Sequence, residues 1–239
     1  NYNFLDLGWN VRLLSDNQIK EAVQQARSSD LAILVVGENS MRYHWNEKTC
    51  GENSDRYELS LPGRQQELVE AVAATGVPTV VILVNGRPLT TEWIDENMPC
   101  IIEAWEPGVA GGQALAEILY GKVNPSGKLP ITIPRSTGQI QCMYNHKFTN
   151  HWFPYATGNS LPLYEFGYGL SYTTYKYENL KLSEATITPD KSVKVTVDVT
   201  NTGKMDGEET VQLYIRDEYS SATRPVKELK DFARIPLKA

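Results

Sequence analysis

The sequence contains little cysteine and no long hydrophobic run. Its 239 residues include three cysteines, Cys50, Cys100 and Cys142, which lie far apart and form no Cys-x-x-Cys pair. Such spacing indicates neither a disulfide framework nor a zinc site. No apolar stretch approaches the ~20 residues that a transmembrane helix needs. We therefore expect no membrane span and no structural metal.

An excess of positive charge is also missing. Lys and Arg number 23 against 29 Asp and Glu, which gives a net charge of -6. This balance opposes binding to a phosphate backbone, so nucleic acid is not an expected partner. Gly111-Gly112 lies where a helix is expected to start, but the chain contains no Gly-x-Gly-x-x-Gly or Walker sequence. A nucleotide-binding domain is disfavoured, and we expect no cofactor.

The first two thirds of the chain alternate between helical and strand-like patterns. This alternation is typical of an α/β domain with a mainly parallel sheet sandwiched by helices. The apolar runs fit buried strands, and Gly or Pro residues mark their ends. The expected helices lie in 19–26, 68–73 and 112–120, and the expected strands lie in 31–36, 79–84 and 101–105.

The pattern changes in the last third of the chain. A short edge strand is expected at 129–133, and no period is visible from Gly138 to Tyr168. After Tyr177, strict alternation in 193–200 and 210–215 predicts β-strands broken by turns. About four strands fit before the last residue, whereas an all-β sandwich usually has about seven. We therefore expect an incomplete β-sandwich.

The segment from Trp45 to Arg56 combines aromatic and carboxylate side chains and has no helix or strand period. It follows the apolar run that ends at Val36 and precedes the helix-start signal Ser60-Leu-Pro-Gly63. In open α/β sheets, ligands bind where loops leave the carboxyl ends of the strands. This position predicts an active-site loop.

Several segments, taken in order, resemble family 3 glycoside hydrolases, the β-glucosidase and β-xylosidase group. Each segment alone is a weak signal, but their order along the chain is specific. They are Gly51-Glu-Asn-Ser-Asp-Arg56 with Leu59-Ser-Leu-Pro62, Val84-Asn-Gly-Arg-Pro-Leu89, Trp105-Glu-Pro-Gly108, Asn124-Pro-Ser-Gly-Lys-Leu-Pro130 and Tyr164-Glu-Phe-Gly-Tyr-Gly-Leu-Ser-Tyr172.

The resemblance covers nearly the whole chain and implies two domains. Residues 1–175 correspond to most of the family's C-terminal α/β sandwich domain, and residues 176–239 to the start of a fibronectin type III-like domain. The resemblance also implies an N-terminal (β/α)8 barrel that is not in this chain and that would supply an Asp nucleophile. The first strand of the sandwich domain is likewise expected to lie before Asn1.

The resemblance assigns the acid/base role to Glu52, the glutamate shortly before Ser54-Asp55-Arg56. Glu47 is the alternative, because acid/base glutamates of the family lie at variable distances from the Asp-Arg pair. Retaining glycosidases need two carboxyl groups about 5 to 5.5 Å apart, and this chain supplies only the acid/base. An exposed surface carboxylate is the ordinary fate of a Glu in a loop, and the motif context argues against it here.

Five further residues of the loop and its flanks are candidates for supporting roles. Tyr43, His44 and Trp45 have flat faces suited to stacking on a sugar, and packing beneath the loop is an equally good interpretation. Arg56 is a candidate for substrate binding, and Asp55 for anchoring the loop, with an Asp55–Arg56 pair as the favoured way of fixing it. A metal role for His44 is disfavoured, since no second ligand lies at suitable spacing.

The leading hypothesis is therefore a retaining β-glycosidase that removes terminal glucose or xylose from non-reducing ends of β-glycosides. The alternative is a non-catalytic module that binds carbohydrate or another subunit. Expected partners are a β-glycoside or oligosaccharide, the barrel domain, and a second copy in a homodimer formed at an unpaired sheet edge. The resemblance implies a periplasmic or extracellular location.

Overall fold

The computed structural model describes residues 5, 14–40, 47–148 and 154–239. The chain forms two compact units. The first contains Asn1–Leu115 and Ile131–Phe166, and the second contains Ala116–Pro130 and Gly167–Ala239. Among the described residues, no helix has the length and apolar character needed to cross a bilayer.

A three-stranded parallel sheet forms the centre of the first unit. The strands β1 (Ala32–Gly37), β2 (Thr79–Val84) and β3 (Cys100–Glu103) lie in the order β1-β2-β3. Val36 is in register with Leu83, and Ile82 with Ile102. Because successive parallel strands are joined through helices, their carboxyl ends meet at one edge of the sheet. The expected α/β class is confirmed.

Helices follow the pattern that the sequence predicts, with one addition. They are α1 (Asp16–Arg27), α2 (Gln65–Ala73), α3 (Glu92–Asn97) and α4 (Gly111–Leu119). A capping box starts α1, because the Ser15 side chain accepts from the Gln18 backbone N–H and the Gln18 side chain accepts from the Ser15 N–H. The short helix α3 was not predicted, since six residues are too few to show a helical period.

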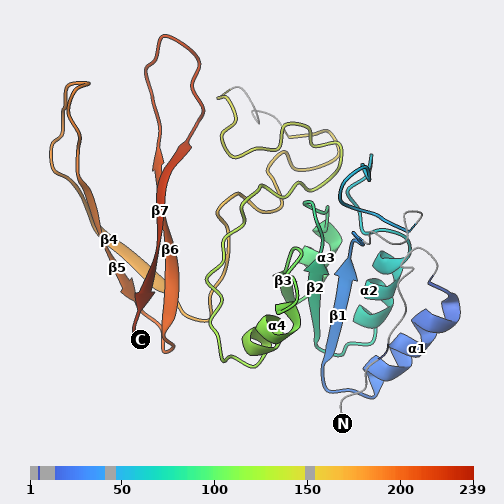
Figure 1. The fold of residues 1–239 in the computed structure, drawn as a ribbon. Helices are drawn as coiled ribbons and strands as arrows, with labels where there is room; N and C mark the ends of the chain where they lie inside the picture. Colours follow the sequence, from blue (N-terminus) through green and yellow to red (C-terminus); the bar gives the residue numbers. More distant parts are fainter. Residues whose placement is uncertain (1–4, 6–13, 41–46, 149–153) are drawn as a thin grey trace. The chain divides into compact units, whose positions relative to one another are not determined.

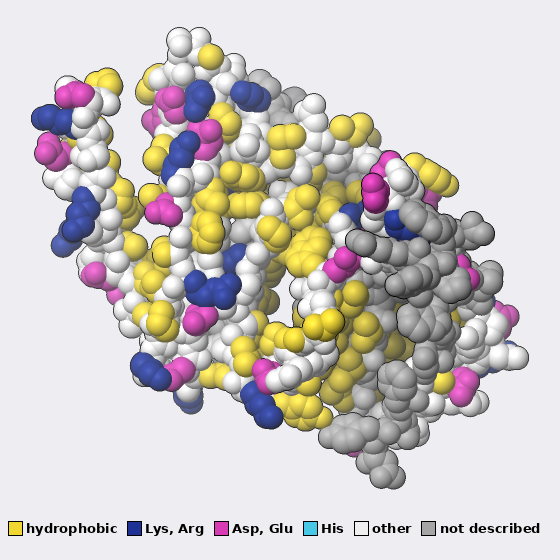
Figure 2. Space-filling model, viewed as in Figure 1, with side chains coloured by type: hydrophobic (Ala, Val, Ile, Leu, Met, Phe, Trp, Pro, Cys, Tyr) yellow, Lys and Arg dark blue, Asp and Glu magenta, His cyan; other side chains and the backbone are white. Residues whose placement is uncertain are grey.

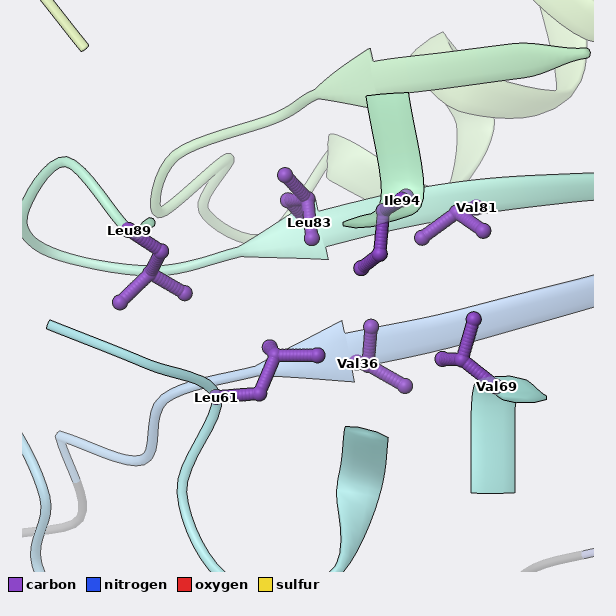
Figure 3. Packing of buried hydrophobic residues seen from close by; sticks show 7 residues of the cluster. All are labelled: Val36, Leu61, Val69, Val81, Leu83, Leu89 and Ile94. Carbon is purple, nitrogen blue, oxygen red and sulfur yellow. The ribbon is translucent and has the colours of Figure 1, made fainter. Parts of the chain in front are cut away.

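The helices α1, α2 and α3 pack on the same face of the sheet. Figure 1 shows α1 and α2 side by side next to β1. In one core cluster, Val36 lies near Leu61 and Val69, while Val81 and Leu83 of β2 lie near Ile94 and Leu89 (Figure 3). A second cluster joins α1 and α2 through Leu14, Ala26, Leu68 and Val72. Burial of these side chains is the main source of stability for this unit.

The opposite face of β1 is open to solvent. Ile33 is 46% exposed and Val35 is 63% exposed, although both lie in a strand of apolar residues. Among the described residues, β1 also pairs with β2 alone and so forms one edge of the sheet. An apolar face next to a free edge is a site for further packing or for self-association.

The prediction of an edge strand at 129–133 was wrong. In this segment only Ile133 forms a bridge, to Tyr164, and Leu129 exchanges isolated hydrogen bonds with Gly167 and Tyr168. Pro130 and Pro134 flank the bridge, and their missing N–H groups prevent a continuous ladder. The described parts of 138–168 are irregular, as the lack of a period predicted.

The second unit contains two antiparallel pairs of strands. β4 (Tyr175–Leu182) pairs with β5 (Val195–Asn201), and β6 (Gly207–Ile215) pairs with β7 (Glu228–Leu237). Along β5, exposed and partly buried residues alternate, which is the pattern that predicted a strand with one face covered. These four strands agree with the expected β-sandwich fold.

Charged side chains of both signs are interspersed on the molecular surface. In the view of Figure 2, the basic and acidic groups of the described residues are mixed, and hydrophobic side chains lie between them. The acidic net charge of the chain is thus not accompanied on this face by a separate basic patch.

Candidate active site

The candidate site lies at the carboxyl ends of the three parallel strands. Glu38 follows β1, Asn85 follows β2, and Glu103 is the last residue of β3. This edge of an α/β sheet is where ligands usually bind. The loop that carries Glu47 and Glu52 leaves β1 at the same edge.

The loop is closed at its base by hydrogen bonds between Asn39 and Thr49. The Thr49 N–H donates to Asn39 O at 2.8 Å, and the Asn39 N–H donates to Thr49 Oγ1 at 2.7 Å. Cys50 N–H adds a longer bond of 3.3 Å to the same Asn39 carbonyl. The chain therefore returns to the sheet edge just before the segment Gly51–Arg56.

Glu52 lies in a tight turn that exposes its side chain. The Ser54 N–H donates to Gly51 O at 3.1 Å, which closes the turn around Glu52 and Asn53. Gly51 has a φ of 88° and Asn53 a φ of 58°, and glycine and asparagine tolerate this left-handed region best. The buried Lys48 ammonium donates to the Glu52 carbonyl oxygen. The backbone of Glu52 is thus fixed while the residue as a whole is exposed to solvent.

Arg87 joins the two flanks of this turn. Its Nη2 donates to Thr49 O at 3.3 Å and to Ser54 O at 2.8 Å. Arg87 belongs to the turn after β2, which is part of the rigid sheet edge. One guanidinium group therefore connects the sheet to the chain on both sides of Glu52.

Glu38 holds Arg87 and Arg56 together. Its side chain is completely buried, and Oε1 lies 3.1 Å from both Arg56 Nη1 and Arg87 Nε. Its second oxygen accepts from the Gly86 N–H at 3.4 Å. Arg56 also donates from Nη2 to Ser60 O at 2.7 Å. A buried carboxylate is tolerated when it is paired and hydrogen-bonded in this way, and removal of one partner is strongly destabilising.

The backbone before Glu38 leaves no room for a side chain. Gly37 has a φ of 142°, and a Cβ atom there would lie 1.9 Å from the carbonyl oxygen of Val84. The Glu38 N–H donates to that same carbonyl at 2.8 Å. Close approach of the β1 and β2 backbones thus determines where Glu38 enters the site.

Glu103 is a second carboxyl group with an altered environment. Burial raises its pKa to about 7, although hydrogen bonds from the Trp105 N–H and from Asn85 oppose the shift. The Trp105 N–H lies 3.0 Å from Oε1, and Asn85 Nδ2 lies 3.4 Å from Oε2. Asn85 Oδ1 is buried and has no hydrogen-bond partner among the residues that the structure describes. Glu103 therefore changes its charge near neutral pH inside the sheet edge.

Cys50 is buried beneath the same turn. Its Sγ lies 3.7 Å from Glu106 Oε1, to which the thiol donates. Burial and, to a smaller extent, the negative charges of Glu38 and Glu106 raise the pKa of Cys50 to about 11, while the charge of Arg87 opposes this shift. The thiol therefore stays neutral and serves to fill space. All three cysteines are free.

The predicted site residues differ in whether the structure describes them and in how exposed they are. Tyr43, His44 and Trp45 lie outside the described residues. Glu47 is partly buried, whereas Glu52 is exposed. Among the described residues, no group of three or more His, Cys, Asp or Glu side chains could hold a metal ion.

The described contacts of Arg56 are with Glu38 and Ser60. Asp55 is exposed, and Arg56 pairs with Glu38 rather than with its neighbour in the described contacts. Glu38, Arg87 and Glu103 were not predicted as site residues. A signal was present, because each lies within three residues of a strand's carboxyl end.

Comparison with protein families identifies both parts of the chain. Residues 7–172 match the model of the glycosyl hydrolase family 3 C-terminal domain. Residues 209–239 match the model of a fibronectin type III-like domain. The segments matched have the α/β and antiparallel β architectures described above.

Individual relatives are similar over nearly the whole chain. A β-xylosidase of Formosa agariphila is 44% identical over 97% of this chain, and a periplasmic β-glucosidase of Salmonella typhimurium is 43% identical over 92%. The solved structure of a β-glucosidase from Erythrobacter marinus has a TM-score of 0.86 and 42% identity over 93% of this chain. The β-glucosidase of Listeria innocua, in complex with glucose, has a TM-score of 0.87 and 32% identity over 96%.

The chain spans only part of the length of these proteins. It covers 31% of the Formosa enzyme, 29% of the Salmonella enzyme, and 29% and 32% of the two solved chains. On the match of residues 7–172, the chain belongs to glycoside hydrolase family 3.

Proposed function

We propose that this chain supplies the acid/base loop of a retaining β-glycosidase. The substrate would be a terminal, non-reducing β-D-glucosyl or β-D-xylosyl residue of a β-glycoside. The names of the relatives support this class of substrate, since they are called β-xylosidases and β-glucosidases. The family to which the chain belongs supports glycoside hydrolysis in general.

The observation that carries the proposal is the presentation of Glu52. Its backbone is held by Lys48 and by the turn from Gly51 to Ser54, while its carboxyl group is exposed. A general acid must reach the leaving-group oxygen with a fixed geometry, so an exposed carboxyl on a fixed backbone suits this role. Glu47 is the alternative on the same loop.

Glu52 would act twice in each turnover. In the first step the carboxyl O–H of Glu52 gives its proton to the glycosidic oxygen as the C1–O bond breaks. A carboxylate nucleophile forms a bond to C1 at the same time. In the second step the Glu52 carboxylate takes a proton from water, the water oxygen bonds to C1, and the nucleophile leaves.

The nucleophile would come from a second domain of the full-length protein. Because the matched relatives are about three times as long as this chain, we propose that an N-terminal (β/α)8 barrel provides an Asp for this role. The α/β unit would then deliver Glu52 to the barrel's substrate pocket. The chain alone, from residue 1 to residue 239, is expected to release no sugar from aryl β-glycosides.

The test uses the full-length protein carrying Glu52→Ala or Glu47→Ala. Aryl β-glucosides and β-xylosides with good and poor leaving groups are compared, with and without azide. If Glu52 is the acid/base, Glu52→Ala lowers kcat/KM for poor leaving groups by about 10²- to 10⁴-fold and spares kcat/KM for good ones. With good leaving groups kcat falls because the second step lacks its base, and azide restores kcat by forming a glycosyl azide. Glu47→Ala then resembles the wild type.

Other results would reassign the role. If only Glu47→Ala shows the leaving-group dependence and the azide rescue, Glu47 is the acid/base. If neither variant differs from the wild type, the chain acts as a non-catalytic module that binds carbohydrate or a subunit. Binding of β-gluco-oligosaccharides by the chain alone, measured by calorimetry, would then identify that activity.

Location and assembly are part of the same proposal. The Salmonella relative is named a periplasmic enzyme, which supports a periplasmic or extracellular location. Subcellular fractionation of the source cells with activity assays tests this. The exposed Val35 on the edge strand β1 supports homodimer formation by the isolated chain. Val35→Lys would then shift its sedimentation coefficient to that of a monomer.

The division of the chain at about residue 175 is also proposed. On this view residues 176–239 form the start of the fibronectin type III-like domain. Limited proteolysis with mass spectrometry of the fragments tests the boundary. A stable fragment that ends near residue 175 is expected.

A further inference from the structure

We propose that Glu38 and Arg87 form a positioning unit that sets the orientation of Glu52 during proton transfer. This inference rests on the proposed function, because it assumes that Glu52 is the acid/base. It assigns to the two residues an effect on the reaction that goes beyond their contribution to stability. Neither residue is proposed to touch the sugar.

The contacts form a continuous chain from the sheet to the turn. Glu38 lies at the end of β1 and binds the Nε side of Arg87 at 3.1 Å. The other side of the same guanidinium, through Nη2, donates to the carbonyls of Thr49 and Ser54. These carbonyls flank Glu52 on both sides. A tilt of the guanidinium plane would therefore move both ends of the turn together.

Burial shows that Glu38 acts through Arg87 rather than on a ligand. The Glu38 side chain is 0% exposed and Arg87 is 20% exposed, so no substrate reaches the Glu38 carboxylate. Every contact of Glu38 oxygens described here is with Arg56, Arg87 or the Gly86 N–H. The Glu38 carboxylate fixes the orientation of two guanidinium groups. Through its hydrogen bonds to Thr49 and Ser54, Arg87 in turn fixes the position of the turn.

The planar guanidinium group is essential to this geometry. Arg presents its donors in a rigid fork, so binding at Nε fixes where Nη2 points. A lysine at position 87 would keep the charge but could not contact Glu38, Thr49 and Ser54 from one plane. This difference separates positioning from simple charge neutralisation.

The test measures kcat/KM of the full-length protein on two β-glycosides of the sugar it hydrolyses faster. One has a poor alkyl leaving group, and the other has a 2,4-dinitrophenyl group that needs no acid. The variants are Glu38→Gln, Arg87→Lys and Glu52→Ala. For the first two, the inference predicts a loss of about 10- to 100-fold on the alkyl glycoside and less than about threefold on the dinitrophenyl glycoside.

A matched control separates positioning from lower stability. Val72→Ala creates a cavity in the cluster between α1 and α2 and touches none of the loop contacts. Its melting temperature is expected to fall while its selectivity between the two substrates stays at the wild-type value. Each variant is assayed well below its own melting temperature, and Arg87→Lys serves if Glu38→Gln does not fold.

The outcomes distinguish the inference from the proposed function. If Glu52→Ala shows the leaving-group selectivity and both Glu38→Gln and Arg87→Lys show it more weakly, the positioning role is supported. If Glu52→Ala is selective while the folded positioning variants behave like Val72→Ala, the inference is overturned and the proposed function stands. If Glu52→Ala is itself unselective, the proposed function fails and the inference fails with it.

Discussion

Gln65 and Gly37 exchange two hydrogen bonds in the interior of the first unit. The Gly37 N–H donates to Gln65 Oε1 at 2.8 Å, and Gln65 Nε2 donates to the Gly37 carbonyl at 2.7 Å. Gln65 is the first residue of α2 and Gly37 is the last residue of β1. A side-chain amide therefore completes the backbone hydrogen bonding at the strand end from which the candidate active-site loop leaves.

Replacement of Gln65 by leucine should destabilise the protein. The variant leaves the buried N–H and C=O groups of Gly37 without partners, and each unpaired group costs about 1–3 kcal/mol. We expect the free energy of unfolding to fall by roughly 2–5 kcal/mol, measured by urea denaturation. Gln66→Ala is the control, because Gln66 is partly exposed and its described side-chain hydrogen bond is to Glu70 on the same helix. Equal free energies of unfolding for Gln65→Leu and Gln66→Ala would contradict this account.

The substitution Gly37→Ala should be far more severe than an alanine elsewhere in the chain. A Cβ atom at position 37 would meet the Val84 carbonyl oxygen at 1.9 Å, and the φ of 142° disfavours any side chain. We expect little soluble folded protein. Gly112→Ala, in helix α4, meets nothing within 4 Å and should be neutral or slightly stabilising. Circular dichroism melting of both variants checks the contrast.

Glu103 should make stability depend on pH in the neutral range. Burial raises its pKa from 4.5 to about 7 in the folded protein, so the folded state binds this proton more tightly than the unfolded state. The contribution of this bound proton to the free energy of unfolding is therefore complete below about pH 4.5 and is lost as the pH rises through 7. Glu103→Gln removes the effect.

The measurement is the melting temperature of both proteins from pH 5 to pH 8. The melting temperature of Glu103→Gln should rise relative to that of the wild type as the pH increases. The difference between the two melting temperatures should level off above pH 8. Glu117→Gln, on the helix α4, provides a control for the loss of one negative charge. Parallel curves for the wild type and Glu103→Gln would rule out a shifted carboxyl group at this position.

The three thiols should react at different rates with an alkylating reagent. The thiolate is the reactive form, and burial together with neighbouring carboxylates raises the pKa of Cys50 to about 11. Cys100 is exposed and Cys142 is partly exposed. At pH 8 we expect iodoacetamide to modify Cys100 first and Cys50 only after denaturation. Peptide mass spectrometry over time follows each site, and early labelling of Cys50 would contradict the burial of its side chain.

The sequence was sufficient for the strands and most helices of the first unit. The apolar run 79–84 became β2 with the same bounds, because a strand buried on both faces needs an unbroken run of such residues. The helix at 65–73 began after Pro62, where proline favours a first turn. Segment 129–133 failed as a strand, since Pro130 within it and Pro134 directly after it lack the N–H groups that a ladder needs.

The roles of Glu38 and Arg87 could not be inferred in the same way. A glutamate after a strand is usually exposed, and the turn Asn85-Gly86-Arg87 indicates only turn chemistry. Glu38 is buried because two arginines, 18 and 49 positions further along the chain, converge on it. Such convergence depends on the packing of β1 against β2 and has no local pattern. Motif resemblance predicts Glu52 as the acid/base, but it does not indicate the groups that hold the turn around it.

The turn around Glu52 is held mainly through main-chain carbonyls, those of Thr49, Glu52 and Ser54. Hydrogen bonds to carbonyl oxygens do not depend on which side chain the residue carries. The side chain at position 54 can therefore be varied while Lys48, Arg87 and Glu38 keep the turn in place. Glu52 is kept for the proposed proton transfer, and Asn53 is kept for its φ of 58°. Changes of leaving-group preference can thus be sought at position 54 without altering the groups that hold the turn.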